Sequence, residues 1–167
     1  EMKVITKMEY RPIHISIFGL HNKYTKGEII IDKNMQRNSV WPNGYKIGLI
    51  DSIIKGYPIP LIFVERKILK IDGVKKEVLS VIDGQQRVWT FISFLNGEFP
   101  YLADCGNPFY KNAEAMLHGK YFYEFDSNLI EQIENYELPV SSLHNLEQME
   151  SSIMFERLNR NVVKVND

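Results

Sequence analysis

The chain has 167 residues, the length of one globular domain, and 44% of them are apolar. Its 20 basic and 21 acidic side chains leave a net charge of -1, and the proportions of charged residues (25%) and aromatic residues (12%) exclude disordered, collagen-like and coiled-coil chains. The apolar runs are far shorter than the roughly 20 residues that span a bilayer, and no basic-then-apolar leader opens the chain. We therefore expect a soluble, cytoplasmic protein with no membrane partner. The single cysteine, Cys105, excludes an internal disulfide and a cysteine-rich zinc site.

Charge is distributed unevenly along the chain. Residues 1–87 carry 15 Lys and Arg against 9 Asp and Glu, whereas residues 88–167 carry 5 against 12. An anionic ligand would therefore bind the first half of the chain. Solvated lysines on exposed strands explain the same asymmetry, and the charge distribution alone favours that simpler interpretation.

Helix and strand patterns alternate along the chain, without a repeat or a low-complexity tract. Helices are predicted where apolar residues recur at spacings of three and four between capping residues and glycines. Strands are predicted from short apolar runs, and the Asp-Gly pair at 72–73 favours a hairpin. In chain order these patterns predict a helix over 16–26, a strand over 28–31, a loop over 32–40, a helix over 43–55, strands over 61–64, 67–71 and 77–82, a helix over 88–95, an unassigned stretch over 100–126, a helix over 127–133, a strand over 136–140 and a helix over 145–158.

Two details of these elements are also expected. Ser127 is predicted to cap the helix that follows it. The last helix is predicted to turn Leu146, Met149 and Ile153 towards the core. Together the elements predict an α+β domain with a small mixed sheet and flanking helices.

The segment 81–87 (VIDGQQR) carries the residues best suited to chemistry, because a strand is expected to end there and a helix to begin. The first turn of a helix has unpaired N–H groups that attract anions, and Gly84 permits a sharp turn beside them. Gln85 and Gln86 add amide groups, and Arg87 adds a planar fork that matches phosphate oxygens. Asp83 either caps the helix or holds a divalent cation. By pattern alone, an ordinary turn beside a surface arginine explains the segment equally well.

Two other clusters are weaker candidates. Gln36 and Arg37 lie in the loop before the second helix, and no carboxylate follows Arg37 within four residues. In isolation Arg37 is best read as a solvent-facing arginine, and Trp41 as a core anchor. Near the end of the last helix, Arg157 and Asn159 are polar residues beside the apolar face, and Asn159 could simply end the helix.

Several enzyme classes are not supported by the sequence. It contains no G-x-x-x-x-G-K-[ST] run, no G-x-G-x-x-G run and no G-x-S-x-G elbow. None of the four histidines pairs with another at metal-ligand spacing. The chain is thus neither a Walker-type NTPase nor a dinucleotide-binding enzyme by motif.

Four sequence blocks together resemble the GmrSD-type amino-terminal domain of modification-dependent (type IV) restriction endonucleases. The blocks occur in the order of that family and extend over nearly the whole chain; the Asp-Gly-Gln-Gln-Arg block is the most specific. They are residues 31–41 (IDKNMQRNSVW), 50–60 (IDSIIKGYPIP), 81–87 (VIDGQQR) and 155–159 (FERLN).

The resemblance implies a ParB/sulfiredoxin-like fold that binds and hydrolyses a nucleoside triphosphate with Mg²⁺. On that basis residues 83–87 form the nucleotide site, with Asp83, Gln86 and Arg87 in catalysis. Gln36 and Arg37 would reach the phosphates from the facing loop. Arg157 and Asn159 would close the pocket, with Asp83 and Asn159 as metal ligands.

The family also implies partners. Its members continue into a helical part with an HNH-type nuclease, and none of the histidines here begins the expected H-x-x-P run. We therefore expect residues 1–167 to be a single nucleotide-binding domain, a fragment of a longer protein, that does not cleave DNA alone. We expect the full-length protein to bind DNA. The sequence does not decide whether the protein forms a homo-oligomer. The alternative is a DNA-binding module that senses modified DNA and uses nucleotide only as a switch.

Overall fold

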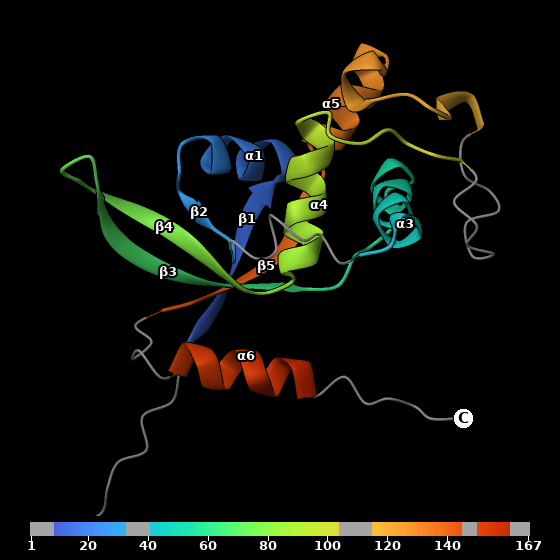
Figure 1. The fold of residues 1–167 in the computed structure, drawn as a ribbon. Helices are drawn as coiled ribbons and strands as arrows, with labels where there is room; N and C mark the ends of the chain where they lie inside the picture. The colour runs from blue at the N-terminus through green and yellow to red at the C-terminus, as the bar shows by residue number, and fades with distance from the viewer. Residues whose placement is uncertain (1–8, 33–40, 104–114, 145–149, 161–167) are drawn as a thin grey trace, which may run out of the picture.

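The computed structural model describes residues 9–32, 41–103, 115–144 and 150–160. It has the expected α+β class, with a sheet and helices interleaved along the chain (Figure 1). The elements are β1 (Tyr10–Ser16), α1 (Ile17–Thr25), β2 (Ile29–Ile30), α3 (Asn43–Ile54), β3 (Ile62–Ile71), β4 (Val74–Asp83), α4 (Gln85–Leu95), 3-10 turns at Ala115–Leu117 and Phe122–Glu124, α5 (Ser127–Glu134), β5 (Glu137–Leu143) and α6 (Glu150–Arg160). In these ranges no helix is both long and apolar enough to cross a bilayer.

The strands form a mixed five-stranded sheet in the order β1-β5-β3-β4-β2. β1 pairs antiparallel with β5, and β3 pairs antiparallel with β4 through the predicted hairpin. The β3–β5 and β4–β2 pairs are parallel. Asp72 and Gly73 both have positive φ, 51° and 80°, as a tight hairpin turn requires.

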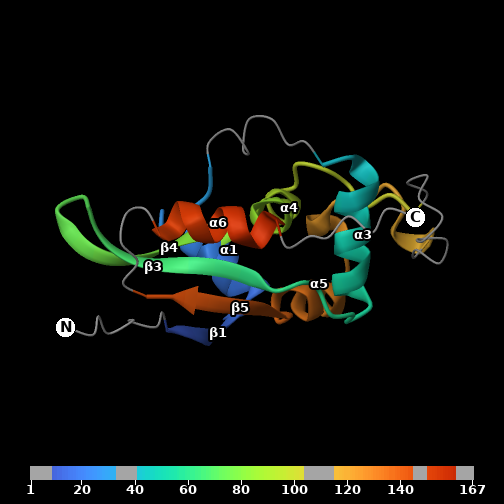
Figure 2. The same cartoon turned by 90° about the horizontal axis from the view of Figure 1, so that it is seen from below.

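Helices α1, α3, α4 and α5 lie on one side of the sheet, and α6 lies on the other (Figures 1 and 2). The hydrophobic core lies between the sheet and helices α1, α3, α4 and α5. It includes Val64 and Val81, which are register partners on adjacent strands. The predicted apolar stripe of α4 is confirmed, since Val88, Phe91 and Ile92 are at most 1% exposed. Burial of this stripe fixes the orientation of α4, and with it the position of the turn from which α4 begins.

Several predicted boundaries are corrected by the structure. The strands predicted at 61–64 and 67–71 are one continuous strand, β3, because Glu65 is buried and Arg66 continues the pairing with β4. Helix α5 is capped by Asp126 rather than Ser127, since the Asp126 carboxylate accepts the Leu129 N–H. β1 was not predicted at all.

The last helix also differs from its prediction. Ile153 is 44% exposed rather than buried on an inner face. Helix α6 instead turns Ser152 and Phe155 towards β4 and the start of α4, where both line cavities. Leu146 and Met149 lie outside the described residues, as do residues 33–40 of the loop predicted at 32–40.

A buried hydrogen bond joins α3 to the segment after α4 and supports the helical layer. The Tyr101 hydroxyl donates to Asp51 Oδ1 at 2.7 Å, and Lys55 Nζ lies 2.9 Å from Asp51 Oδ2. Tyr101 is fully buried and Asp51 is 3% exposed. The carboxylate therefore depends on these donors for its solvation.

Replacing Tyr101 by phenylalanine should lower the free energy of unfolding by about 2 kcal/mol, because a buried carboxylate loses a donor. Urea denaturation followed by circular dichroism measures the change. Tyr136→Phe is the matched control, since its hydroxyl donates only to the neutral Tyr57 carbonyl, at 2.6 Å and near solvent. The control should lose about 1 kcal/mol or less. Equal losses would show that the Asp51 carboxylate does not need Tyr101.

Candidate phosphate-binding turn

The candidate site is the turn between β4 and α4. β4 ends at Asp83, Gly84 is the N-cap, and α4 begins at Gln85. Gly84 has a φ of 91°, a left-handed conformation that other residues rarely adopt. A Cβ at this position would lie 2.9 Å from Arg87 Nη2 and 3.1 Å from Ile62 Cγ1. The turn therefore requires glycine for both its backbone conformation and its close packing.

Arg87 is held at the turn by two oxygens. Its Nη2 donates to the Leu61 carbonyl at 2.9 Å and lies 3.8 Å from Asp83 Oδ2. The Arg87 side chain is only 16% exposed. Burial lowers the pKa of Arg87, and the Asp83 carboxylate opposes that shift. A guanidinium this buried would gain from an additional anionic partner.

Three buried side-chain atoms at the turn have no hydrogen-bond partner among the described residues: Gln85 Oε1, Gln86 Oε1 and Arg87 Nε. No other described residue has such an atom. Gln85 is held through its other amide atom, since Nε2 donates to the Val81 carbonyl at 3.2 Å. Buried polar groups are normally hydrogen-bonded, so three unsatisfied atoms on consecutive residues indicate that a ligand or ordered water completes the site.

Two neighbouring cavities open at this turn. The cavity beside Arg87 has a volume of about 250 Å³, and the cavity between α6 and the β3–β4 face has about 310 Å³. Both are lined by Asp32, Ile82, Gln85 and Phe155. The first is also lined by Trp41, Asp83, Gly84, Gln86 and Arg87, and the second by Glu65, Lys67, Ser80, Val81 and Ser152.

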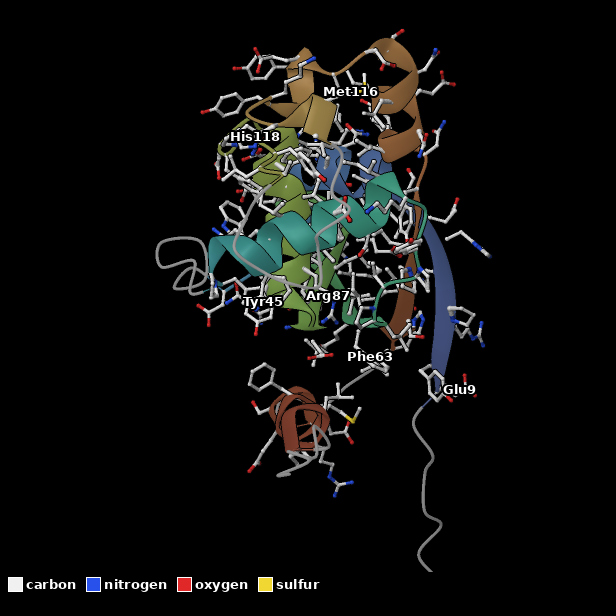
Figure 3. All side chains as sticks on the ribbon, turned by 90° about the vertical axis from the view of Figure 1, so that its right-hand side faces the viewer. Glu9, Tyr45, Phe63, Arg87, Met116 and His118 are labelled. Atoms are coloured by element: carbon white, nitrogen blue, oxygen red, sulfur yellow. The ribbon has the colours of Figure 1, made fainter. Side chains whose placement is uncertain are left out.

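The structure brings together the five predicted residues at 83–87, all of which line the first cavity. Figure 3 shows Arg87 in the first turn of α4, at the end of the helix that is nearer to α6. Gln36 and Arg37 lie outside the described residues. Arg157 is exposed on α6 and lines neither cavity. The side chain of Asn159 is also outside the described part.

Two aromatic residues at the first cavity were not predicted as site residues. Trp41, expected as a core anchor, is half-buried and faces Tyr45 with ring centroids 6.0 Å apart, yet it also lines the cavity. Phe155 is 46% exposed and lines both cavities. The signal for Phe155 was present in the sequence, since it is a large apolar residue off the stripe expected to face the core.

Of the two roles considered for Asp83, capping of α4 is wrong. The N-cap is Gly84, and the Asp83 carboxylate is engaged with Arg87. Asp83 supplies the carboxylate of residues 83–87. It lies at the cavity wall, where it can hold a cation or pair with Arg87.

The comparison with protein families supports the resemblance found in the sequence. The model described as "GmrSD restriction endonuclease, N-terminal domain" matches residues 17–167. The chain belongs to this family. Membership implies a regulatory role in a restriction system, with a nuclease partner domain and DNA. No curated protein and no solved structure matched the chain.

Proposed function

We propose that this domain binds a nucleoside triphosphate at residues 83–87 and hydrolyses it, as the regulatory part of a modification-dependent DNA restriction system. One observation carries the proposal: a left-handed glycine and the N-terminus of α4 line a cavity together with Arg87, whose buried Nε is a donor without a partner among the described residues. A helix N-terminus with a flexible glycine before it suits phosphate oxygens.

Each residue of the turn has a proposed role. The first N–H groups of α4 and the Arg87 guanidinium would offset phosphate charge, and the amide of Gln85 would fix the ligand's orientation. Gln86 Oε1 is a buried acceptor with no partner in the part of the chain that the structure describes, which suits it to orient the attacking water. Catalysis would rest mainly on positioning and on stabilisation of the charge that develops on the phosphates.

Asp83 is the residue in this turn that could hold Mg²⁺. The described residues contain no group of three or more His, Cys, Asp or Glu that could bind a metal by themselves. One carboxylate fits Mg²⁺ that is held largely by phosphate oxygens and water, as in many phosphate-transfer sites. The bound ion would supply charge neutralisation across the phosphates. Asn159 as a second ligand remains a proposal, as do phosphate contacts from Gln36, Arg37 and Arg157.

Calorimetric titration with GTP, ATP and CTP in the presence of Mg²⁺ tests the proposal. The wild-type chain should bind at least one of them, and Arg87→Ala should weaken that binding by roughly 30-fold or more. Arg11→Ala is the matched control, because Arg11 is an exposed arginine on β1 that pairs with Glu9. Undetectable binding by the wild-type chain, or equal affinity for wild type and Arg87→Ala, would count decisively against a phosphate site here.

The alternative proposal is a DNA-reading module that senses modified DNA and uses nucleotide only as a switch. The concentration of basic residues in the first half of the chain favours it. Affinity for modified and plain duplexes, plotted against salt concentration on logarithmic axes, distinguishes it from the first proposal. No slope and no preference for modified DNA would remove this alternative while leaving the nucleotide proposal intact.

A further inference from the structure

The outer half of the β3–β4 hairpin is a two-stranded ribbon. The pairing of β3 with β5 ends at Glu65, and the pairing of β4 with β2 covers only Leu79 and Ser80. Beyond those residues the two strands pair only with each other. Figures 1 and 2 show this ribbon projecting past the edge of the sheet and away from helices α3, α4 and α5.

The ribbon is the basic projection of a chain that is otherwise acidic. Residues 66–77 include five Lys and Arg but only two acidic residues, although the whole chain has a net charge of -1. Arg66 pairs with Glu77, and Lys67 pairs with Glu65. The ion pairs among the described residues do not involve the other three basic residues of the ribbon, Lys70, Lys75 and Lys76.

Two of these lysines face each other on the same side of the ribbon. Lys70 and Lys75 are register partners one residue pair before the turn. Like charges directly opposite in a sheet destabilise it, and an anion between them removes that repulsion. Ile68 follows on the same side of β3 and is 73% exposed, opposite Glu77, which pairs with Arg66, so one apolar side chain lies beside the two ammonium groups.

We propose that this face of the ribbon binds double-stranded DNA, with Lys70 and Lys75 on backbone phosphates and Ile68 against a sugar or base edge. A two-stranded ribbon fits the major groove, which is about 12 Å wide. The charge complements DNA because five basic residues against two acidic ones lie on a projection of a chain whose net charge is -1. A narrow projecting ribbon matches a groove lined by regularly spaced phosphates, whereas an acidic protein partner offers no such groove.

This surface is separate from the nucleotide site, since none of Ile68, Lys70 and Lys75 lines either cavity at the β4–α4 turn. It gives the DNA-reading alternative a physical location without depending on nucleotide binding. Loss of one activity by mutation should therefore leave the other in place.

Fluorescence anisotropy of a labelled DNA duplex, titrated with the 167-residue chain at several salt concentrations, tests the inference. Lys70→Ala/Lys75→Ala should reduce the slope of log affinity against log salt by about 2, and the affinity near 0.1 M salt by roughly tenfold or more. Ile68→Ser should weaken binding while leaving the slope unchanged, because it removes no phosphate contact.

The matched control is Lys26→Ala/Lys120→Ala, which removes two exposed lysines elsewhere and changes net charge equally. It should keep the wild-type slope. Thermal unfolding should confirm that both double variants fold, since the lysines they remove are exposed. The inference is overturned if the wild-type chain binds no duplex at low salt, or if the two double variants lose affinity equally. In either case the ribbon does not contact DNA specifically.

Discussion

Replacing Gly84 by alanine should abolish nucleotide binding and lower the free energy of unfolding by about 1–2 kcal/mol or more. Part of that loss comes from the backbone, because φ at Gly84 is 91° and a left-handed residue with a Cβ is strained by about 1–2 kcal/mol. The rest comes from crowding, since the new methyl would lie 2.9 Å from Arg87 Nη2 and 3.1 Å from Ile62 Cγ1. The guanidinium would have to shift away from the new methyl, which would disturb its hydrogen bond to the Leu61 carbonyl and its orientation towards the cavity.

Gly27→Ala is the control for Gly84→Ala. Gly27 also has positive φ, 73°, but a Cβ there would meet no atom within 4 Å. This variant should therefore show the backbone strain in urea denaturation and retain wild-type affinity in calorimetry. If Gly84→Ala bound nucleotide as well as Gly27→Ala does, the close packing of Arg87 against the turn would be irrelevant to the ligand.

The sequence predicted the elements whose signals are local. Ser16 caps α1 by accepting the Gly19 N–H, and the positive φ of Gly56 and Gly97 ends α3 and α4 where expected. The hairpin at Asp72-Gly73 was equally predictable from the sequence, because a turn with two consecutive residues of positive φ favours Asp or Asn followed by Gly. Each of these features depends on a few neighbouring residues, so a single sequence is sufficient to find it.

The missed strand, β1, shows what a local pattern cannot supply. Its first three residues are exposed, with Tyr10 67% exposed, so the alternation of buried and exposed positions covers only Ile13, His14 and Ile15, which is too short to predict a strand. β1 is a strand because it pairs with β5, and the register partners Tyr10 and Leu143 are far apart in the chain. An edge strand of this kind is specified by its partner rather than by its own composition.

The site divides in the same way. The turn at residues 83–87 was predictable because glycine, amides and arginine follow one another at a strand-to-helix junction. The place of its aromatic walls was not: the position of Phe155 off the predicted stripe was a signal, but Trp41 and Phe155 come from segments before α3 and in α6 that meet only in the folded chain. The burial of one unpaired polar atom on each of Gln85, Gln86 and Arg87, within the described residues, also required the structure, since it depends on what surrounds them. Sequence thus predicted which groups lie together at the turn, and folding determines what else lines the cavity beside them.

Replacing Asp83 by asparagine should have opposite effects on nucleotide binding without and with Mg²⁺. The Asp83 carboxylate lies 3.8 Å from Arg87 Nη2 at the wall of the cavity, where it would repel phosphate oxygens. Removing its charge should therefore tighten metal-free binding, by roughly tenfold for a partly buried pair of charges. With Mg²⁺ present the same change removes a ligand, so the gain in affinity from Mg²⁺ should disappear and the hydrolysis rate should fall by roughly 100-fold.

Calorimetry with and without Mg²⁺, together with a phosphate-release assay, separates these effects. Asp72→Asn is the matched control, because it removes the same charge at the exposed hairpin turn, where Asn followed by Gly is favoured. It should change neither binding nor hydrolysis. Weaker metal-free binding by Asp83→Asn would mean that Asp83 acts by holding Arg87 in place rather than by facing the phosphates. Arg87 would then be the group that contacts the ligand, and the metal would have to be held by residues other than Asp83.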